Sequence, residues 1–343
     1  MMDDMMSFVL LPAVILVAAA LLSFVLLLVL RPVLRRYALA IPNARSSHKA
    51  PTPQGAGIGV MVATVVVAAL AWLAFGDLAD DTIFIVLAAA AGIAIVGAID
   101  DIKPVGVLPR LLLQAAAVAA VLMTLPDDLR IMSVLPQWLE RLALGIGALW
   151  FVNLTNFMDG IDWITTAETI PITAFIAILC FMGQSSFAEG MVALALCGAM
   201  IGFAPLNKPV AKMFLGDVGS LAIGLLLAWM LIGLALRGNL VAALLLPLYY
   251  LADATITLLR RLARGEKIWV AHRTHFYQRA TQGGFTVMQI VTRIFAVNLC
   301  LGLLALSTVM WTGLAVQAMA LACGAVLVAW LLTTFARGRA STS

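Results

Sequence analysis

Runs of apolar residues long enough to cross a lipid bilayer recur along the whole chain. A helix needs about 20 apolar residues to cross the hydrocarbon core. Hydrophobic residues make up 64% of the 343 residues and charged residues only 11%, whereas a soluble domain is about one-quarter charged. The sequence therefore predicts an all-α polytopic membrane protein, and it excludes a soluble enzyme, a disordered chain and a secreted disulfide-bonded scaffold. We predict eleven spans, near residues 7–30, 55–75, 82–99, 108–125, 139–156, 165–183, 187–204, 219–236, 238–259, 287–311 and 313–335.

Basic residues are concentrated in alternate connecting segments. Of the 21 Lys and Arg residues, 18 follow the first, third, seventh, ninth and eleventh predicted spans, and the exceptions are Arg130, Arg141 and Arg237. Cytoplasmic loops carry an excess of positive charge, so we predict a periplasmic N-terminus and a cytoplasmic C-terminus. We treat residues 1–343 as a single integral-membrane domain with cytoplasmic loops near 31–55, 100–108, 157–164, 205–218 and 260–286.

Acidic and amide side chains lie at the cytoplasmic ends of several predicted spans. Asp100 and Asp101 end the third span, and two adjacent carboxylates repel one another unless a divalent cation or a proton compensates them. Asn153, Asn156 and Asp159 recur every three residues at the end of the fifth span, where polar groups are costly unless they face a wet cavity. The alternatives are solvated helix-end acids for the aspartate pair and a structural cap for the second group.

Asp217 lies between Gly216 and Gly219, where the eighth span begins. A helix N-terminus favours anions, and a carboxylate there can recruit a hard cation, although an N-cap aspartate is the simpler interpretation. Asp253 lies within the ninth span and either faces a cavity or pairs with a neighbouring helix.

Two cytoplasmic loops carry basic groups. The loop at 42–57 contains Lys49 among prolines and small residues, which suits either a ligand or a stiff linker. The loop after the ninth span contains His272, Arg273 and His275. Because no third nitrogen or sulfur ligand accompanies the two histidines, we favour donors to a pyrophosphate over a zinc site. A polybasic loop attracted to anionic lipid is the alternative.

Together these groups indicate a site where a soluble phosphorylated substrate meets a membrane-bound one. In order along residues 42–284, the motifs are Lys49-x-x-Thr52-Pro53, Asp100-Asp101, Asn156-x-x-Asp159-Gly160-x-Asp162, Phe214-x-Gly216-Asp217-x-Gly219-Ser220 and His272-Arg273-Thr274-His275. This set resembles the polyprenyl-phosphate N-acetylhexosamine-1-phosphate transferases of glycosyltransferase family 4.

The resemblance implies an enzyme of the bacterial inner membrane with a cytoplasmic active site. Members of the family transfer a sugar 1-phosphate from a UDP-N-acetylhexosamine to undecaprenyl phosphate, release UMP and require Mg²⁺ or Mn²⁺. Such a reaction starts the synthesis of O-antigen, lipopolysaccharide or another cell-wall polysaccharide. The expected partners are the two substrates and the lipid bilayer, without nucleic acid, and a homodimer is allowed.

The resemblance also implies roles for individual residues. Asp217 matches the metal-binding aspartate, and Asp100 and Asp101 match the paired catalytic aspartates, of which Asp100 is our favoured base or orienting group in a direct displacement. The expected substrate-binding residues are Lys49, Asn153, Asn156, Asp159, Asp162, Asn207, Phe214, His272, Arg273 and His275. Among these, Phe214 is expected to stack on the uracil.

The chain departs from the family pattern at a few positions. Trp163 and Ala56 stand where glycine is usual, and the histidine motif is His272-Arg273-Thr274-His275 instead of consecutive histidines. The continuation Tyr277-Gln278 favours O-antigen initiators that use 6-deoxy sugars. The alternatives are the phospho-MurNAc-pentapeptide transferase of peptidoglycan synthesis, a membrane transporter and a non-catalytic scaffold.

Overall fold

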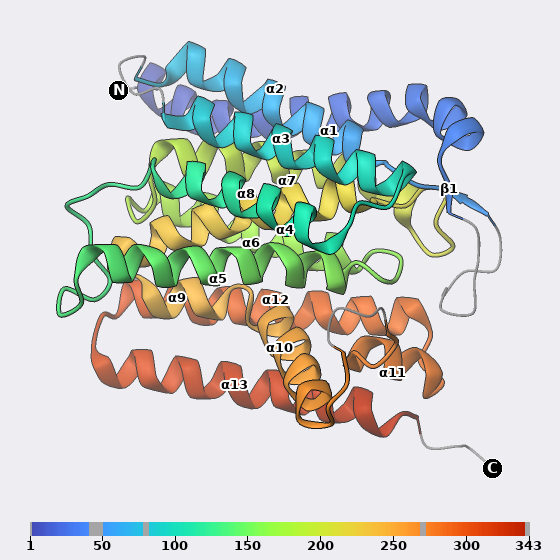
Figure 1. Ribbon diagram of the computed structural model, residues 1–343. Coiled ribbons are helices and arrows are strands. Elements are labelled where there is room, and N and C mark those ends of the chain that lie inside the picture. The colour runs from blue at the N-terminus through green and yellow to red at the C-terminus, as the bar shows by residue number, and fades with distance from the viewer. Residues whose placement is uncertain (1, 41–50, 78–81, 268–271, 340–343) are drawn as a thin grey trace.

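A computed structural model describes residues 2–40, 51–77, 82–267 and 272–339, which are nearly all helical (Figure 1). The prediction of an all-α polytopic protein is confirmed at that level. The helices are α1 (Met2–Tyr37), α2 (Gly57–Phe75), α3 (Thr82–Ile102), α4 (Val107–Leu122), α5 (Gln137–Met158), α6 (Ile164–Phe181), α7 (Phe187–Asn207), α8 (Asp217–Leu236), α9 (Leu240–Leu245), α10 (Leu248–Ala263), α11 (Phe276–Gln282), α12 (Val287–Met310) and α13 (Leu314–Arg337). The short strands β1 (Leu39–Ala40) and β2 (Thr52–Pro53) form an antiparallel pair.

Eight helices in the described part of the chain are long and apolar enough to cross a membrane, namely α1, α2, α3, α6, α7, α8, α12 and α13. The count of eleven spans and the orientation of the termini stay predictions. The expected single span at 238–259 is two helices instead, α9 and α10, which meet at Leu246 and Pro247. Proline has no backbone N–H to continue a helix, and α10 leaves the break at a steep angle to α13 (Figure 1).

Helix α8 is the most enclosed of the candidate spans, and almost all of its residues are buried. It packs against α2, α3 and α5, whereas α1 and α13 expose most of their apolar surface at the outside of the bundle (Figure 1). A helix that is apolar on every side is stable only when other apolar groups surround it. The first turn of α8 is therefore held firmly among neighbouring helices.

Glycines allow other elements to approach this first turn closely. A Cβ atom on Gly97 of α3 would overlap the carbonyl group of Asp217, and one on Gly57 of α2 would overlap the backbone of Gly219. The segment after β2 is joined to the same region, because the Phe214 N–H donates to the Pro53 carbonyl at 2.8 Å and the Ala56 N–H donates to the Phe214 carbonyl at 2.9 Å. Three segments that are distant in sequence thus meet here, namely the end of α3, residues 53–57 and the start of α8.

Candidate active site

Asp101 caps the N-terminus of α8 from the end of α3. Its Oδ1 accepts from the Asp217 backbone N–H at 3.0 Å and its Oδ2 accepts from that of Val218 at 3.3 Å. A carboxylate in this position binds otherwise unpaired N–H groups and interacts favourably with the helix dipole. Gly216 precedes the helix with φ +78°, and a Cβ atom there would overlap the Asp101 carboxylate. Gln54 also donates its side-chain N–H to Asp101 Oδ1 at 2.5 Å.

Asp100 and Asp217 share Arg110 of α4. The Arg110 Nη1 lies 2.8 Å from Asp100 Oδ2 and 3.6 Å from Asp217 Oδ2, and the Val105 N–H donates to Asp100 Oδ1 at 2.5 Å. The Asp100 side chain is only 9% exposed, so solvated helix-end acids are the wrong interpretation of the pair. Sequence reasoning missed Gln54 and Arg110, although an arginine ten residues after Asp100 is a signal for charge compensation.

Asn156 joins the end of α5 to the aspartate cluster, which is formed by Asp100, Asp101 and Asp217. Its Nδ2 donates to Asp217 Oδ1 at 2.8 Å and to Ser220 Oγ at 2.9 Å. Asn153 is different, because its Nδ2 donates to Gln114 Oε1 of α4 at 2.7 Å and to the Leu149 carbonyl, and the side chain is buried. Asn153 therefore fastens α5 to α4, and the structure does not bring it into the aspartate cluster.

Asp159 lies in the turn between α5 and α6 and accepts from Thr165 Oγ1 at 2.5 Å. Burial, together with repulsion by Asp101 and Asp162, raises the pKa of Asp159 to about 7, and the Thr165 hydrogen bond acts in the opposite direction. Asp162 lies in the same turn, where its Oδ2 accepts from the Ala211 N–H at 3.0 Å. This turn is thus hydrogen-bonded to the segment before α8, and Asp159 is close enough to Asp101 for the two charges to repel.

Trp163 and Asn207 hold the segment before α8 in place. The Trp163 N–H donates to Asn207 Oδ1 at 2.7 Å, and Asn207 Nδ2 donates to the Met213 carbonyl at 2.9 Å. Trp163 has φ +65°, a left-handed conformation that favours glycine, and its indole N–H donates to the Ala204 carbonyl at 2.6 Å. Phe214 lies in this segment, is half-buried and forms a β-bridge with Gln54.

Asp253 of α10 anchors the histidine loop. The fully buried carboxylate accepts from the backbone N–H groups of Phe276 and Tyr277 at 3.0 and 3.1 Å, and it lies 3.2 Å from His275 Nδ1. The interpretation of Asp253 as a structural partner is therefore supported. His275 is also buried, with 2% exposed, and its contact with substrate stays a prediction.

The start of α11, which follows the loop, lies next to the C-terminal end of α5. The His272 ring stacks on His275 with centroids 4.8 Å apart, and Tyr277 Oη donates to the Phe157 carbonyl at 3.2 Å. Burial, helped by the charges of His275 and Arg261, lowers the pKa of His272 to about 4, so its imidazole is neutral at pH 7. Arg273 is half-buried in the same loop. Lys49, the remaining predicted site residue, lies outside the described residues.

The fold and the site define a polytopic membrane protein in which carboxylates, amides and an arginine converge at helix ends. The model of glycosyl transferase family 4 matches residues 83–235, which extend from α3 through α8. The chain is 24% identical over 319 residues to the probable undecaprenyl-phosphate N-acetylglucosaminyl 1-phosphate transferase of Bacillus subtilis, covering 87% of each chain. The undecaprenyl-phosphate alpha-N-acetylglucosaminyl 1-phosphate transferase of Salmonella typhi is 29% identical over 268 residues, which are 72% of this chain and 70% of that protein.

A phospho-N-acetylmuramoyl-pentapeptide-transferase of Limosilactobacillus fermentum is 37% identical, but over only 92 residues, 26% of this chain and 28% of that protein. The resemblance to glycosyltransferase family 4 that the motifs predicted is confirmed by the family model that matches residues 83–235 and by these relatives. The matched region contains Asp100, Asp101, Asn156 and Asp217, and so includes the aspartate cluster.

Proposed function

We propose that this protein transfers an N-acetylhexosamine 1-phosphate from a UDP-sugar to undecaprenyl phosphate, releases UMP and starts a lipid-linked glycan of the O-antigen or cell-envelope type. The names of the Bacillus and Salmonella relatives support the acceptor and the sugar class. The observation that carries the proposal is the convergence of Asp100, Asp101 and Asp217. A phosphate and a diphosphate are both negatively charged, so one can attack the other only where nearby groups position them and compensate that charge. The distribution of basic residues supports a cytoplasmic site in the inner membrane.

The donor set fits a divalent cation. Asp100 and Asp217 lie within 4 Å of one guanidinium nitrogen, and with Asp101 they give the cluster three carboxylates against one arginine. No group of three or more His, Cys, Asp or Glu side chains in the described residues could hold a metal alone, but Mg²⁺ commonly takes one or two carboxylates plus substrate phosphates. We assign the metal to Asp217, with Asp100 beside it. When bound with the UDP-sugar, Mg²⁺ or Mn²⁺ would neutralise the diphosphate and stabilise the leaving UMP.

The residues of the chain position the reactants. Asp101 fixes the first turn of α8, and Asn156 holds one oxygen of Asp217. In the proposed direct displacement, Asp100 deprotonates or orients the lipid phosphate, and an oxygen of that phosphate attacks the phosphorus that carries the sugar. The bond from this phosphorus to the bridging oxygen breaks, and UMP leaves with the electron pair of that bond.

The nucleoside is proposed to lie beside the segment that precedes α8. Phe214 would stack on the uracil, and its backbone is held on both sides by Pro53 and Ala56. Asp162 and Asn207 bind backbone groups of this same segment, so we propose that they act by shaping the pocket. Lys49 would also contact the nucleoside, and His272 and Arg273 would contribute positive charge or hydrogen bonds to the phosphates or the sugar.

The decisive experiment measures UMP release by purified protein with undecaprenyl phosphate, a panel of UDP-N-acetyl sugars that includes a 6-deoxy sugar and UDP-MurNAc-pentapeptide, with and without Mg²⁺. We expect release with one sugar only when Mg²⁺ is present, and a loss of about 100-fold or more in Asp217→Asn. Asp127→Asn is the matched control, because its side chain is 92% exposed in a connecting loop, and it should keep full activity.

Solute movement into liposomes without UMP release from any donor would instead identify a transporter. A labelled phospho-enzyme formed without lipid acceptor would contradict the direct displacement.

A further inference from the structure

Glu168 is a buried acid that none of the sequence motifs includes. It lies one turn inside α6, a candidate membrane span, and its side chain is fully buried. An ionisable group is costly at such a position, which makes it a candidate for a function. Among the described residues, no lysine, arginine or histidine forms an ion pair with it. Its partners are therefore hydrogen-bond donors.

Asn298 of α12 binds this carboxyl group. Its Nδ2 donates to Glu168 Oε2 at 2.6 Å and to the Ala167 carbonyl at 3.1 Å, and Asn298 is itself buried. Glu168 Oε1 and Asn298 Oδ1 are also buried, and in the described part of the chain neither has a hydrogen-bond partner. Both oxygens are acceptors, so a side chain that offers a donor as well as an acceptor would suit position 168, as a protonated carboxyl or an amide does.

Glu168 also reaches the first turn of α10, which the break at Pro247 separates from α9. The first N–H groups of a helix have no acceptor within that helix, and the backbone of Tyr250 hydrogen-bonds the Glu168 carboxyl. One buried acid therefore connects α6, α10 and α12 at the point where α10 begins.

Two adjacent tyrosines in this turn lead to two polar parts of the candidate site. Tyr250 Oη donates to Thr165 Oγ1 at 3.4 Å, and Thr165 Oγ1 donates to Asp159 Oδ1 at 2.5 Å. Tyr249 Oη donates to Asp253 Oδ2 at 3.2 Å. Both tyrosines are buried. Tyr250 is thus linked to the turn between α5 and α6, and Tyr249 is linked to the anchor of the histidine loop.

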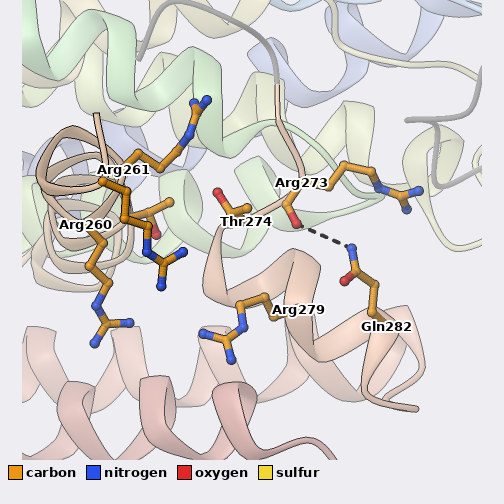
Figure 2. A pocket seen from close by; sticks show the side chains of 8 residues that line it. Arg260, Arg261, Arg273, Thr274, Arg279 and Gln282 are labelled. Carbon is orange, nitrogen blue, oxygen red and sulfur yellow. Dashed lines mark hydrogen bonds between the residues drawn. The ribbon is translucent and has the colours of Figure 1, made fainter. Parts of the chain in front are cut away.

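The histidine loop is fastened to both α10 and α11. Figure 2 shows Arg273 and Thr274 of this loop beside Arg261 of α10 and Arg279 of α11. Gln282 of α11 donates to the Arg273 carbonyl at 3.3 Å. Since the loop is also anchored to α10, the position of α10 determines where the loop lies relative to the turn between α5 and α6.

We propose that Glu168 is a positioning residue of the transfer reaction, which fixes the first turn of α10 and, through Tyr250 and Tyr249, aligns the turn that carries Asp159 with the histidine loop. It acts by hydrogen bonding and not by charge. Both aligned parts carry groups that are proposed to contact the substrates, so a small shift of α10 changes catalysis. The kinetic effect rests on the proposed function, whereas the effect on the histidine loop does not.

The first test compares Glu168→Leu with Glu168→Gln in the UMP assay. Leucine removes every hydrogen bond of the side chain at a similar size, whereas glutamine keeps an acceptor and adds a donor. We expect Glu168→Leu to lower kcat/KM for the UDP-sugar about tenfold or more, with a rise in KM as well as a fall in kcat, and Glu168→Gln to stay within about twofold of wild type. An equal loss in the two variants would show that the charge is required and would refute the proposal.

Glu189→Gln is the matched control for a loss of stability. Glu189 is also a buried acid, but it pairs with Arg237 at the end of α8 opposite to Asp217. Removal of one partner of a buried ion pair is destabilising, so this variant should unfold at a lower temperature and keep the wild-type KM and kcat/KM per folded protein. The same behaviour in Glu168→Leu would mean that Glu168 is only structural, and the proposal would be wrong.

Two further variants decide the question if Glu168→Leu does not fold. Tyr250→Phe and Tyr249→Phe each remove one hydroxyl group and keep the ring. Loss of a hydrogen bond of ordinary strength corresponds to a factor of about 2 to 10. We expect Tyr250→Phe to lower kcat/KM by such a factor at an unchanged rate of trypsin cutting between residues 260 and 279. Tyr249→Phe should raise the rate of that cutting by a similar factor. Wild-type behaviour of both variants would contradict the proposed links.

Trypsin cutting is measured without substrate and separates this proposal from the proposed function. We expect faster cutting of the histidine loop in Glu168→Leu, and wild-type cutting in Glu168→Gln and Glu189→Gln. If wild-type protein releases no UMP from any donor, the proposed function fails, and the cutting rates still decide whether Glu168 holds the loop. Equal cutting of wild type and Glu168→Leu would overturn the positioning role.

Discussion

At the scale of single residues, the two adjacent aspartates at the end of α3 have different environments. Asp101 accepts with both carboxylate oxygens from backbone N–H groups of α8, whereas Asp100 accepts from the Val105 N–H and pairs with Arg110, which it shares with Asp217. We therefore interpret Asp101 as a positioning residue and Asp100 as the member of the pair that meets the substrate. The pair is adjacent in sequence, and only its surroundings distinguish the two side chains.

Asp101→Asn tests this division of roles. An amide has a single acceptor oxygen, so one of the two N–H groups at the start of α8 loses its partner, at a cost of about 1 kcal/mol in stability. The resulting shift of Asp217 should lower UMP release by about 100-fold, since small misplacements of reacting groups have effects of that order. Thermal unfolding measures the stability, and the UMP assay measures the activity. Lower activity at an unchanged unfolding temperature would contradict the capping role.

The raised pKa of Asp159 predicts that the stability of the protein depends on pH. Its pKa of about 7 in the folded protein lies above the ordinary value of 3.8, so the folded state binds the proton more tightly than the unfolded state. The protonated Asp159 carboxyl contributes its full stabilisation of the folded state below about pH 4. This stabilisation is lost as the pH rises from about 4 to 7. Asp159→Asn removes the titration. We expect the unfolding temperature of the variant, relative to wild type, to rise between pH 5 and pH 8, and a constant difference would exclude the raised pKa.

At the scale of elements, α10 connects the histidine loop to the rest of the bundle. Asp253 reaches across 23 residues of sequence to accept from the first N–H groups of α11. The helix pattern at 238–259 predicts an uninterrupted span, but Pro247 divides it. Because of this break, α10 can point its basic end and Asp253 toward α11 instead of continuing the direction of α9.

Asp253→Asn should release the histidine loop. Loss of buried hydrogen bonds to a carboxylate costs about 1–3 kcal/mol, and the loop contains several trypsin sites after arginine. We expect trypsin to cut the variant faster than wild type between residues 260 and 279, with the fragments identified by mass spectrometry. Glu266→Gln is the control, because its ion pair with Arg261 is partly exposed and such pairs contribute little. Equal cutting of wild type and Asp253→Asn would contradict the anchoring role.

At the scale of the whole molecule, the polar site lies at one end of an apolar bundle. Helix α8 is enclosed by its neighbours, while α1 and α13 present apolar side chains outward. The outward apolar surface suits lipid, and the clustering of basic segments on one side determines which end is expected in the cytoplasm.

Reporter fusions test this orientation. Green fluorescent protein fused after Ser343 should fluoresce, and alkaline phosphatase at the same position should be inactive, because the C-terminus is expected in the cytoplasm. Alkaline phosphatase fused after Asp128, in a predicted outer loop, should be active and serves as the reciprocal control. The opposite pattern would invert the topology and place the aspartate cluster on the outer face.

The sequence by itself determined that the chain is a helical membrane protein, and it identified most polar groups of the site, because crossing a bilayer imposes a local requirement for apolar residues. Tertiary structure decided what those groups do. Asp101 caps a helix 116 residues away, Asn153 binds Gln114 in a helix contact, and His275 faces Asp253. These roles depend on which helices pack together, and no local pattern specifies the partner of a hydrogen bond that joins distant segments.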